Sequence, residues 1–363
     1  MITLFCIRPK GFNVGNDAIY MGMQYYLYQA FDEVVNIITL PATSRYENHG
    51  KAGLTAKTIY EINQYGHGVI VGGGNLYENG EIDISLDALN SLDVPLMLFS
   101  LSRGRIYNRR LELSDRTDAL PDRVLKALNL KAQFSLARDH ATRNYLHKLG
   151  CRSVKTGGCP TIYLDRTINR LPQIPIHEKG GVLISVRHPS LMSIPLHKQA
   201  QLYEDIRRII KFVLDNGYPK VRLLCHDHRD ITFAASFPGI EYVYTGDVYS
   251  YLAMLHSCEL NITYRLHSAL PCLAYGKPVI MISYDERAIS LMDTIGFDEW
   301  NIKMLETEDV LKQVEDRYSR LNELPKIKKG AQKKWNALDN IMRKTFKSFS
   351  QQVFQYKANL RKE

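Results

Sequence analysis

The segment NITYRLHSALPCLAYGKPVIMISYDERA, residues 261–288, decides the fold. It reads as an apolar strand that stops at Arg-Leu-His, then a helical stretch, then a second apolar strand that stops at Tyr-Asp. A strand, a helix and a strand in this order form a βαβ unit, whose two strands lie parallel in one sheet. Charged groups are costly to hold near a core, so the cations that follow these strands predict a negatively charged ligand.

The same alternation of strands and helices runs through most of the chain in two series, 2–150 and 182–324. Between them, LDRTINRLPQIPIHEKGG (164–181) has two prolines, scattered charges and terminal glycines, which is typical of a linker. We therefore predict an α/β protein with two doubly wound domains. The expected boundaries are a first domain at 1–165, a linker at 166–180, a second domain at 181–325 and a tail at 326–363.

The composition is that of a globular protein. Of 363 residues, 45% are hydrophobic, and no run reaches the ~20 apolar residues that a membrane span needs. The first residues, MITLFCIRPKGF, have no basic leader and no small-residue cleavage site, so we expect no signal peptide. Six scattered cysteines without a Cys-x-x-Cys pair favour reduced thiols, and these favour a cytoplasmic location.

The net charge of +9 is concentrated in the tail. Residues 326–363 carry eleven Lys or Arg and two acidic residues, whereas residues 1–325 carry 36 basic and 36 acidic residues. A basic face spread over the fold is therefore not expected, and we predict no nucleic-acid partner.

The tail also has helical periodicity. From Trp335, apolar residues recur every three or four positions, at Leu338, Met342, Phe346, Phe349, Val353, Tyr356 and Leu360. This predicts an amphipathic helix with a lysine-rich opposite face. Two interpretations remain open: the helix packs across the protein's own two domains, or it lies peripherally on an anionic membrane surface, at the inner face, near lipid-linked glycans.

Two strand ends in the first series have residues suited to a ligand. In GNDAIY (15–20), Gly15 and Asn16 precede a helix expected from about Asp17 to Ala30. Free backbone N–H groups at its start, near Asn16 and Asp17, suit an anion or a hydroxyl-rich ligand. Gly73, Gly74 and Asn75, in GGGNLYENG (72–80), allow close approach of a ligand or of another backbone. The spacing matches neither a dinucleotide fingerprint nor a P-loop. A capped turn and tight packing are the simpler alternatives for these two motifs.

Three further strand ends carry weaker signals. Arg138 ends FSLAR directly before the expected helix cap Asp139, and a local ion pair between the two is the simpler explanation. Arg187, in ISVRHP, is one more cation at a strand end. In CHDHRD (225–230), strand alternation separates the candidate ligands onto two sides, so we predict no metal site. His226 can still reach a cleft.

The strongest signal is Arg265-Leu266-His267 together with Arg287. Side chains alternate on a strand, so Leu266 can face the core while its two neighbours face outward. Arginine grips carboxylate or phosphate oxygens in pairs, and histidine exchanges a proton near neutral pH. This combination predicts a site for a doubly anionic small molecule that undergoes proton transfer. A surface charge cluster is the alternative.

These segments resemble the polysaccharide pyruvyl transferase family. The resemblance covers residues 10–300 and runs through NVGNDAI, VIVGGGNL, SLARDHATRNYLHKLG, TYRLHSALPCLAYGKPVIMISYDERA and MDTIGF. It implies two Rossmann-like domains arranged as in GT-B glycosyltransferases, with the acceptor on the first and the donor on the second. It also implies phosphoenolpyruvate as donor, a sugar of a cell-surface glycan as acceptor, and a cyclic pyruvate ketal as product. No cofactor is expected beyond phosphoenolpyruvate as co-substrate.

The resemblance assigns roles by position. The expected catalytic residues are His267 and Arg138, and the expected donor-binding residues are Arg265, Leu266, Arg287 and Arg187. Arg287 stands where many members have the lysine of Tyr-Asp-x-Lys, which keeps the charge and changes its geometry. The expected acceptor or cleft-lining residues are Asn16, Asp17, Gly73, Gly74, Asn75, Arg103, His226, Tyr284 and Asp285. Of these, Arg103 lies in SRGRIYN, where many members have a glycine-rich turn.

Two other functions fit the same fold. One is a GT-B glycosyltransferase that uses a nucleotide sugar. Residues 180–300 lack the Glu-x7-Glu pair of many retaining members, which counts against one subclass only. The other is a non-catalytic glycan-binding protein, which would have a disrupted anion site; the Arg265/His267 pair argues against it.

Overall fold

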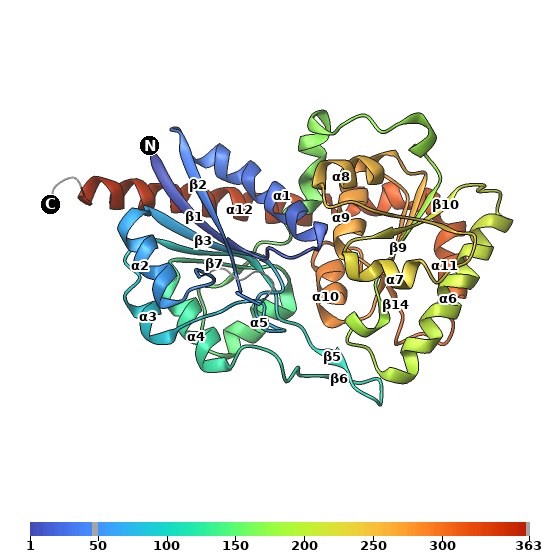
Figure 1. Ribbon diagram of the computed structural model, residues 1–363, viewed down its shortest axis with the longest axis horizontal. Coiled ribbons are helices and arrows are strands. Elements are labelled where there is room, and N and C mark those ends of the chain that lie inside the picture. Colours follow the sequence, from blue (N-terminus) through green and yellow to red (C-terminus); the bar gives the residue numbers. More distant parts are fainter. Residues whose placement is uncertain (46–49, 361–363) are drawn as a thin grey trace.

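The structure, a computed structural model, describes residues 1–45 and 50–360 and consists of two α/β domains that lie side by side (Figure 1). The predicted fold class is confirmed: each domain has a parallel six-stranded sheet with helices packed around it. The central strands are buried on both faces, as parallel sheets require; all residues of Gly68–Gly74 and of Val182–Val186 are buried.

The first sheet has the strand order β2-β1-β3-β4-β7-β8. Its strands are β1 (Ile2–Arg8), β2 (Val35–Pro41), β3 (Gly68–Gly74), β4 (Leu96–Leu101), β7 (Phe134–Ala137) and β8 (Lys155–Thr156). Its helices are α1 (Val14–Ala30), α2 (Ala56–Tyr65), α3 (Leu86–Asn90), α4 (Asp122–Lys131) and α5 (His140–Lys148). A small antiparallel hairpin, which we did not expect, is formed by β5 (Ile106–Tyr107) and β6 (Leu113–Ser114).

The second sheet has the strand order β11-β10-β9-β12-β13-β14. Its strands are β9 (Val182–Val186), β10 (Val221–Cys225), β11 (Glu241–Tyr244), β12 (Leu260–Thr263), β13 (Val279–Ser283) and β14 (Ile302–Lys303). Its helices are α6 (Leu196–Asp215), α7 (Ile231–Ala234), α8 (Val248–Ser257), α9 (Leu266–Tyr275), α10 (Glu286–Thr294) and α11 (Val310–Ser319).

The strand orders indicate where a ligand binds. The chain changes direction across the sheet between β1 and β3 in the first domain, and between β9 and β12 in the second. Ligands of doubly wound sheets bind outside the carboxyl ends of the strands at such points. These ends face each other across the boundary of the two domains (Figure 1).

The segment between the domains, where we predicted a linker at 166–180, contains ordered turns. Residues Pro160–Arg170 form consecutive 3₁₀ turns that pack against α1 and α9. Arg166 belongs to this packed segment, because its guanidinium bonds the carboxylate of Asp339 at 2.8 Å. The remaining part, up to Gly181, has a further short 3₁₀ turn at Ile176–Glu178.

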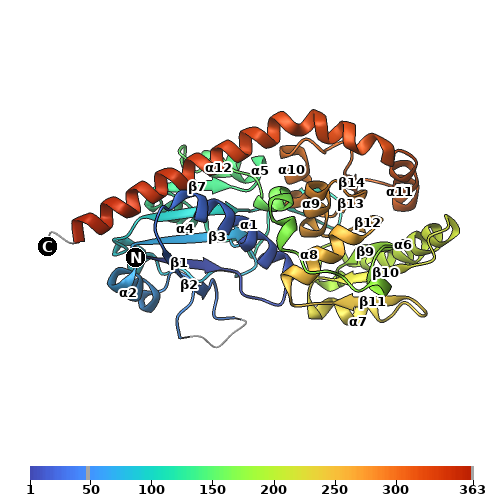
Figure 2. The ribbon, with the colours of Figure 1, turned by 90° about the horizontal axis from the view of Figure 1, so that it is seen from above.

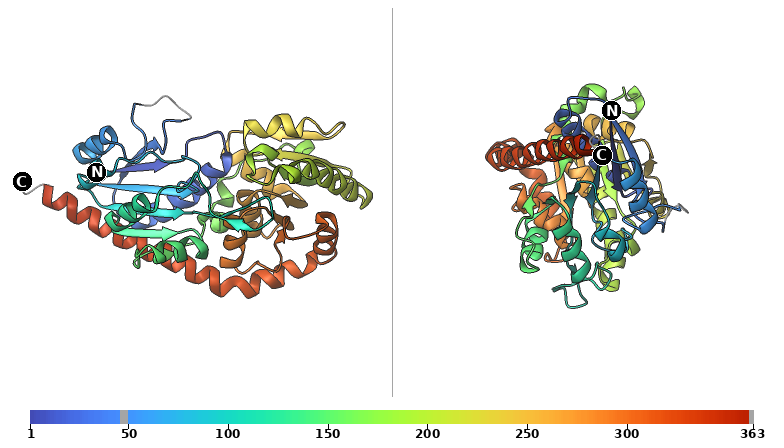
Figure 3. Two further views of the ribbon diagram at one scale, coloured as in Figure 1. Left: turned by 90° about the horizontal axis from the view of Figure 1, so that it is seen from below. Right: turned by 90° about the vertical axis from the view of Figure 1, so that its left-hand side faces the viewer.

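The tail forms one helix, α12 (Leu324–Leu360), which runs along both domains (Figures 2 and 3). In the second domain, the indole N–H of Trp335 donates to the carbonyl of Ile295 at 2.9 Å. In the first domain, the rings of Phe346 and Phe99 lie 5.1 Å apart, edge to face. The apolar face of the helix is therefore packed on the protein itself, and a membrane contact through its lysine-rich face stays a prediction.

None of the described helices combines the length and the apolarity that crossing a bilayer requires. The six cysteines are buried and unpaired.

Candidate active site

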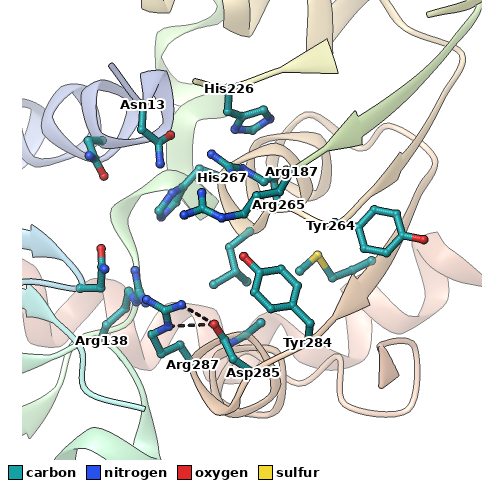
Figure 4. A pocket seen from close by; sticks show the side chains of 15 residues that line it. Asn13, Arg138, Arg187, His226, Tyr264, Arg265, His267, Tyr284, Asp285 and Arg287 are labelled. Atoms are coloured by element: carbon teal, nitrogen blue, oxygen red, sulfur yellow. Dashed lines mark hydrogen bonds and ion pairs between the residues drawn. The ribbon is translucent and has the colours of Figure 1, made fainter. Parts of the chain in front are cut away.

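A cavity of about 610 Å³ lies between the two domains, at the carboxyl ends of their strands (Figure 4). We call it the arginine cavity. It is lined by Asn13, Asn16, Asn75, Arg138, Arg187, His226, Tyr264, Arg265, Leu266, His267, Met281, Tyr284, Asp285, Arg287 and Ala288. Four arginines and a single carboxylate line it, which leaves an excess of three positive charges for a ligand to neutralise. The predicted cations from distant parts of the chain thus meet in one space.

Arg265 has a buried guanidinium whose two terminal nitrogens, Nη1 and Nη2, form no hydrogen bond among the described residues. It follows β12 at the first position before α9, and its side chain is 5% exposed. Asp230 is the nearest carboxylate, with Oδ2 at 3.8 Å from Nη1. Because a buried charge without hydrogen bonds is costly, this guanidinium favours an anionic ligand in the cavity.

Arg287 is held by one carboxylate from each domain. Its Nε and Nη2 donate to Asp285, the cap of α10, with Nε at 3.0 Å from Oδ2. Its Nη1 lies 3.3 Å from Oε2 of Glu78, a fully buried residue of the first domain. Glu78 also accepts from the backbone N–H of Gly104 at 3.0 Å. A lysine has one nitrogen and could not reproduce this fork, which is a physical reason for arginine at this position.

Arg138 brings a cation from the first domain. Its Nη2 donates to Oγ of Ser102 at 2.6 Å, and its Nε has no hydrogen-bond partner among the described residues. The local ion pair with Asp139 is not formed. The carboxylate of Asp139 instead caps α5, accepting from the backbone N–H of Thr142 at 2.9 Å.

His267 is a shielded, neutral imidazole. Its Nε2 is inaccessible to solvent and has no hydrogen-bond partner in the described part of the chain. The start of α1 lies directly against the ring: a Cβ on Gly15 would stand 2.9 Å from Nδ1. Burial, and then the charges of Arg138, Arg265 and Arg287, hold the pKa of His267 well below 6.5. The imidazole is thus neutral at pH 7, and the positive charges around it oppose its protonation until a ligand offsets them.

His226 has a similar environment. Burial, and then the charges of Arg265 and His267, hold the pKa of His226 well below 6.5. Its Nε2 lies 3.1 Å from the hydroxyl of Tyr251, which also donates to the backbone carbonyl of His267 at 2.7 Å. Tyr251 therefore fixes both histidines in place.

Four of the predicted acceptor residues lie outside the lining of the cavity. Asp17 pairs with Arg8 at 2.6 Å. Arg103 stacks on the ring of Tyr145, 3.6 Å from its centroid, and pairs with Asp115 at 3.0 Å.

Gly73 and Gly74 shape the backbone rather than the cavity surface. Both have positive φ, +50° and +97°, and a Cβ on Gly73 would stand 2.2 Å from Cγ2 of Ile19. Close packing of α1 against the end of β3 therefore accounts for Gly73. A Cβ on Gly74 would meet only ordinary contacts at 3.7 Å, so its positive φ is the reason for glycine there.

Sequence reasoning missed four lining residues, Asn13, Tyr264, Met281 and Ala288, and the supporting carboxylate of Glu78. Asn13 had a recognisable signal, because it is an asparagine directly before a helix and caps α1, accepting from Gly15 at 3.0 Å. Among the described residues, no group of three or more His, Cys, Asp or Glu could hold a metal ion.

The comparisons with known proteins identify the family of this chain. A family model described as polysaccharide pyruvyl transferase matches residues 13–286, which include all residues that line the cavity up to Asp285. A curated relative, the amylovoran biosynthesis protein AmsJ of Erwinia amylovora, is 26% identical over 189 residues. That alignment spans 45% of this chain and 45% of AmsJ.

Solved structures share the fold. UDP-GlcNAc 2-epimerase of Methanocaldococcus jannaschii has a TM-score of 0.56 at 12% identity, over 87% of this chain and 92% of that chain. MnaA of S. aureus has a TM-score of 0.55 at 15% identity, over 89% of this chain and 88% of that chain. These proteins have the GT-B-like arrangement of two domains. The same arrangement is therefore confirmed for this chain, as the sequence resemblance implied.

Proposed function

The chain belongs to the polysaccharide pyruvyl transferase family, and we propose that it moves the pyruvyl group of phosphoenolpyruvate onto a sugar of a cell-surface polysaccharide or of its lipid-linked precursor. The product is a cyclic ketal, and phosphate is released. The observation that carries this proposal is the guanidinium of Arg265, buried without a hydrogen-bonded partner in a cavity that also holds three other arginines and a neutral histidine.

The charge of the donor fits the cavity. Phosphoenolpyruvate carries a carboxylate and a phosphate, and the cavity has an excess of three positive charges. Arg265 and Arg187 line the second-domain side, and Arg138 lies across the domain boundary from them (Figure 4). Such a spread of guanidiniums suits two anionic groups on one small molecule.

The reaction balances with the residues present. One sugar hydroxyl adds to C2 of phosphoenolpyruvate while C3 takes up a proton and becomes a methyl group. The C2–O bond to phosphate then breaks, and the second hydroxyl adds to C2 and closes the ketal. Of the two hydroxyl protons, one ends on the methyl carbon and the other on the released phosphate.

His267 is the group placed to move these protons. Its neutral imidazole accepts a hydroxyl proton and returns it to C3, and a bound dianion would offset the arginines that now lower its pKa. The arginines stabilise the charge that develops on the departing phosphate.

A thermal-shift comparison of phosphoenolpyruvate with nucleotide sugars tests the donor. We expect phosphoenolpyruvate to raise the melting temperature, since a ligand at 100 times its dissociation constant stabilises by about 2.7 kcal/mol. Arg265→Ala should abolish this shift, and Arg152→Ala, at an exposed arginine far along the chain, should keep it. A shift with a UDP-sugar and none with phosphoenolpyruvate would instead support the nucleotide-sugar glycosyltransferase.

A further inference from the structure

A second cavity, of about 760 Å³, adjoins the arginine cavity. The two share Asn13, Asn16, Asn75 and Arg187 in their lining, so they are neighbouring parts of one cleft. We call the second one the amide cavity. A ketal forms only if two hydroxyls of the acceptor reach the donor carbon, so the acceptor must occupy space that is continuous with the donor site.

The lining of the amide cavity differs chemically from that of the arginine cavity. Three charged side chains line it, those of Glu81, Arg187 and Arg229. Six uncharged polar side chains also line it: Asn13, Asn16, Asn75, Asn79, Ser190 and Ser193. Its charged groups already have hydrogen bonds within the protein. Arg229 bonds Asp227 at 2.9 Å through Nε, and Glu81 accepts from the side-chain amide of Asn79 at 3.1 Å. Arg187 donates to the backbone carbonyl of Leu191 at 2.8 Å and keeps its charge, which it shares with the arginine cavity. Amides and hydroxyls both donate and accept hydrogen bonds, as sugar hydroxyls do.

Two of these amides are available to a ligand. The side chains of Asn16 and Asn75 have no hydrogen-bond partner within residues 1–45 and 50–360, and both also line the arginine cavity. They stand at the start of α1 and just after β3, where the first sheet changes direction. A ligand bonded to both would lie at the border of the two cavities.

An exposed aromatic ring completes the site. Phe12 lines the amide cavity and is 54% exposed, although phenylalanine is usually buried. Its ring contacts that of His228 edge to face, with centroids 4.2 Å apart. A pyranose has an apolar face of C–H groups and a rim of hydroxyls, so it matches an aromatic surface bordered by amides.

From these observations, and resting on the proposed function, we propose that the amide cavity is the acceptor subsite and binds an uncharged pyranose. The sugar stacks on Phe12 and bonds Asn16 and Asn75, so that two of its hydroxyls point into the arginine cavity. The lining argues against an acidic sugar or a second anion here, since neutral amides and hydroxyls predominate.

Saturation-transfer NMR on the full chain tests the subsite with methyl β-D-glucopyranoside, methyl β-D-galactopyranoside and methyl α-D-mannopyranoside. We expect saturation of at least one of them by the wild-type protein. Phe12→Ala should weaken its binding roughly five- to tenfold. Phe12→Tyr should keep binding, and so should Tyr60→Ala, which removes a ring that is 70% exposed on α2.

A second pair of variants, Asn16→Ala and Asn75→Ala, should each weaken glycoside binding. The thermal shift with phosphoenolpyruvate should stay in Phe12→Ala, because Phe12 lines the amide cavity and not the arginine cavity. Melting temperatures without ligand identify any variant that has lost its fold. The subsite is overturned if the wild-type protein saturates none of the glycosides, or if binding survives Phe12→Ala and both asparagine variants. Glycoside binding without any response to phosphoenolpyruvate would reject the donor and leave the subsite standing.

Discussion

The two domains contribute very different surfaces to the arginine cavity. The second domain supplies Arg187, His226, Arg265, His267 and Arg287, whereas the first supplies Asn13, Asn16, Asn75 and the single cation Arg138. We refer to these as the charged wall and the amide wall. In the function that we propose, the charged wall neutralises the dianionic donor and the amide wall offers neutral hydrogen-bonding groups, so that the reaction requires both domains together.

The domain boundary itself is held by polar contacts close to the cavity. Arg105 donates through Nε and Nη2 to Oε1 of Glu286, at 2.9 and 2.6 Å, and the backbone N–H of Ala141 donates to Oγ of Ser290 at 3.0 Å. Glu78 reaches across to Arg287. These contacts place the amide wall against the charged wall, and they connect the position of Arg287 to the first domain.

The largest expected effect comes from removing the imidazole of the charged wall. His267→Ala should lower kcat by about 10²–10⁴-fold, because a general acid–base group is lost. Binding of phosphoenolpyruvate should remain measurable, since the arginines are unchanged. The measurement is phosphate release, with His197→Ala, at an exposed residue of α6, as control. Near-normal phosphate release by His267→Ala would contradict the role.

The next effect separates the arginines of the two walls. Arg265→Ala should weaken the affinity for phosphoenolpyruvate roughly 100-fold, equivalent to about 3 kcal/mol. Arg138→Ala should reduce the affinity less and kcat more, since Arg138 is already bonded to Ser102 and lies on the amide wall. Calorimetry measures both affinities. Equal losses would remove the contrast between the walls.

A smaller effect is expected from the carboxylate that crosses the boundary. Glu78→Gln keeps the shape and removes the charge that faces Arg287, so kcat/KM should fall roughly tenfold through misplacement of the guanidinium. Glu78→Asp should restore part of the loss, which a purely structural defect would not show. An unchanged KM for phosphoenolpyruvate with unchanged kcat would show that Asp285 alone positions Arg287.

The pH dependence of kcat/KM should reflect the lowered pKa of His267. Because the pKa of His267 is lowered, the imidazole stays neutral as the pH falls below 6.5, and the acidic limb of kcat/KM should lie below that value. The same pKa shift makes the folded protein less stable at acidic pH. The unfolded chain takes up the proton near pH 6.5, so the free energy of unfolding decreases as the pH falls through 6.5. An acidic limb centred above 6.5 would contradict a neutral His267.

The smallest effect concerns the lysine face of α12, which lies away from both walls. Substitution of Lys329, Lys333 and Lys344, all exposed, by glutamine should leave kcat unchanged and shift stability by less than ~1 kcal/mol. Flotation with anionic liposomes compares this variant with the wild-type chain. Equal flotation agrees with a helix that serves the protein's own packing, and reduced flotation would show a membrane contact.

Much of the architecture could be predicted from the sequence because its signals are local. Alternating strands and helices gave the two parallel sheets, and the three- to four-residue spacing of the tail gave α12. The start of α1 was placed three residues late, at Asp17 instead of Val14, because Asn13 was not recognised as its cap.

Part of the site could be predicted because its signals in the sequence are also local. Arg138, Arg265, His267 and Arg287 each follow a strand, and parallel strands bring such positions to one edge. Which way a loop turns depends on distant contacts: Arg103 faces Tyr145 rather than the cleft, and Glu78 reaches Arg287 although 209 positions separate them. No local pattern encodes these outcomes.

The long α12 has a consequence for the order in which the chain folds during synthesis. Its last turns cover the first domain: the rings of Phe349 and Phe31 lie 6.5 Å apart, and Val353 packs over Gly68. The ribosome must therefore add Leu324–Leu360 before the sheet of the first domain receives its cover. Until then, apolar surface near the N-terminus stays open to water, which makes the nascent first domain a natural client for chaperones.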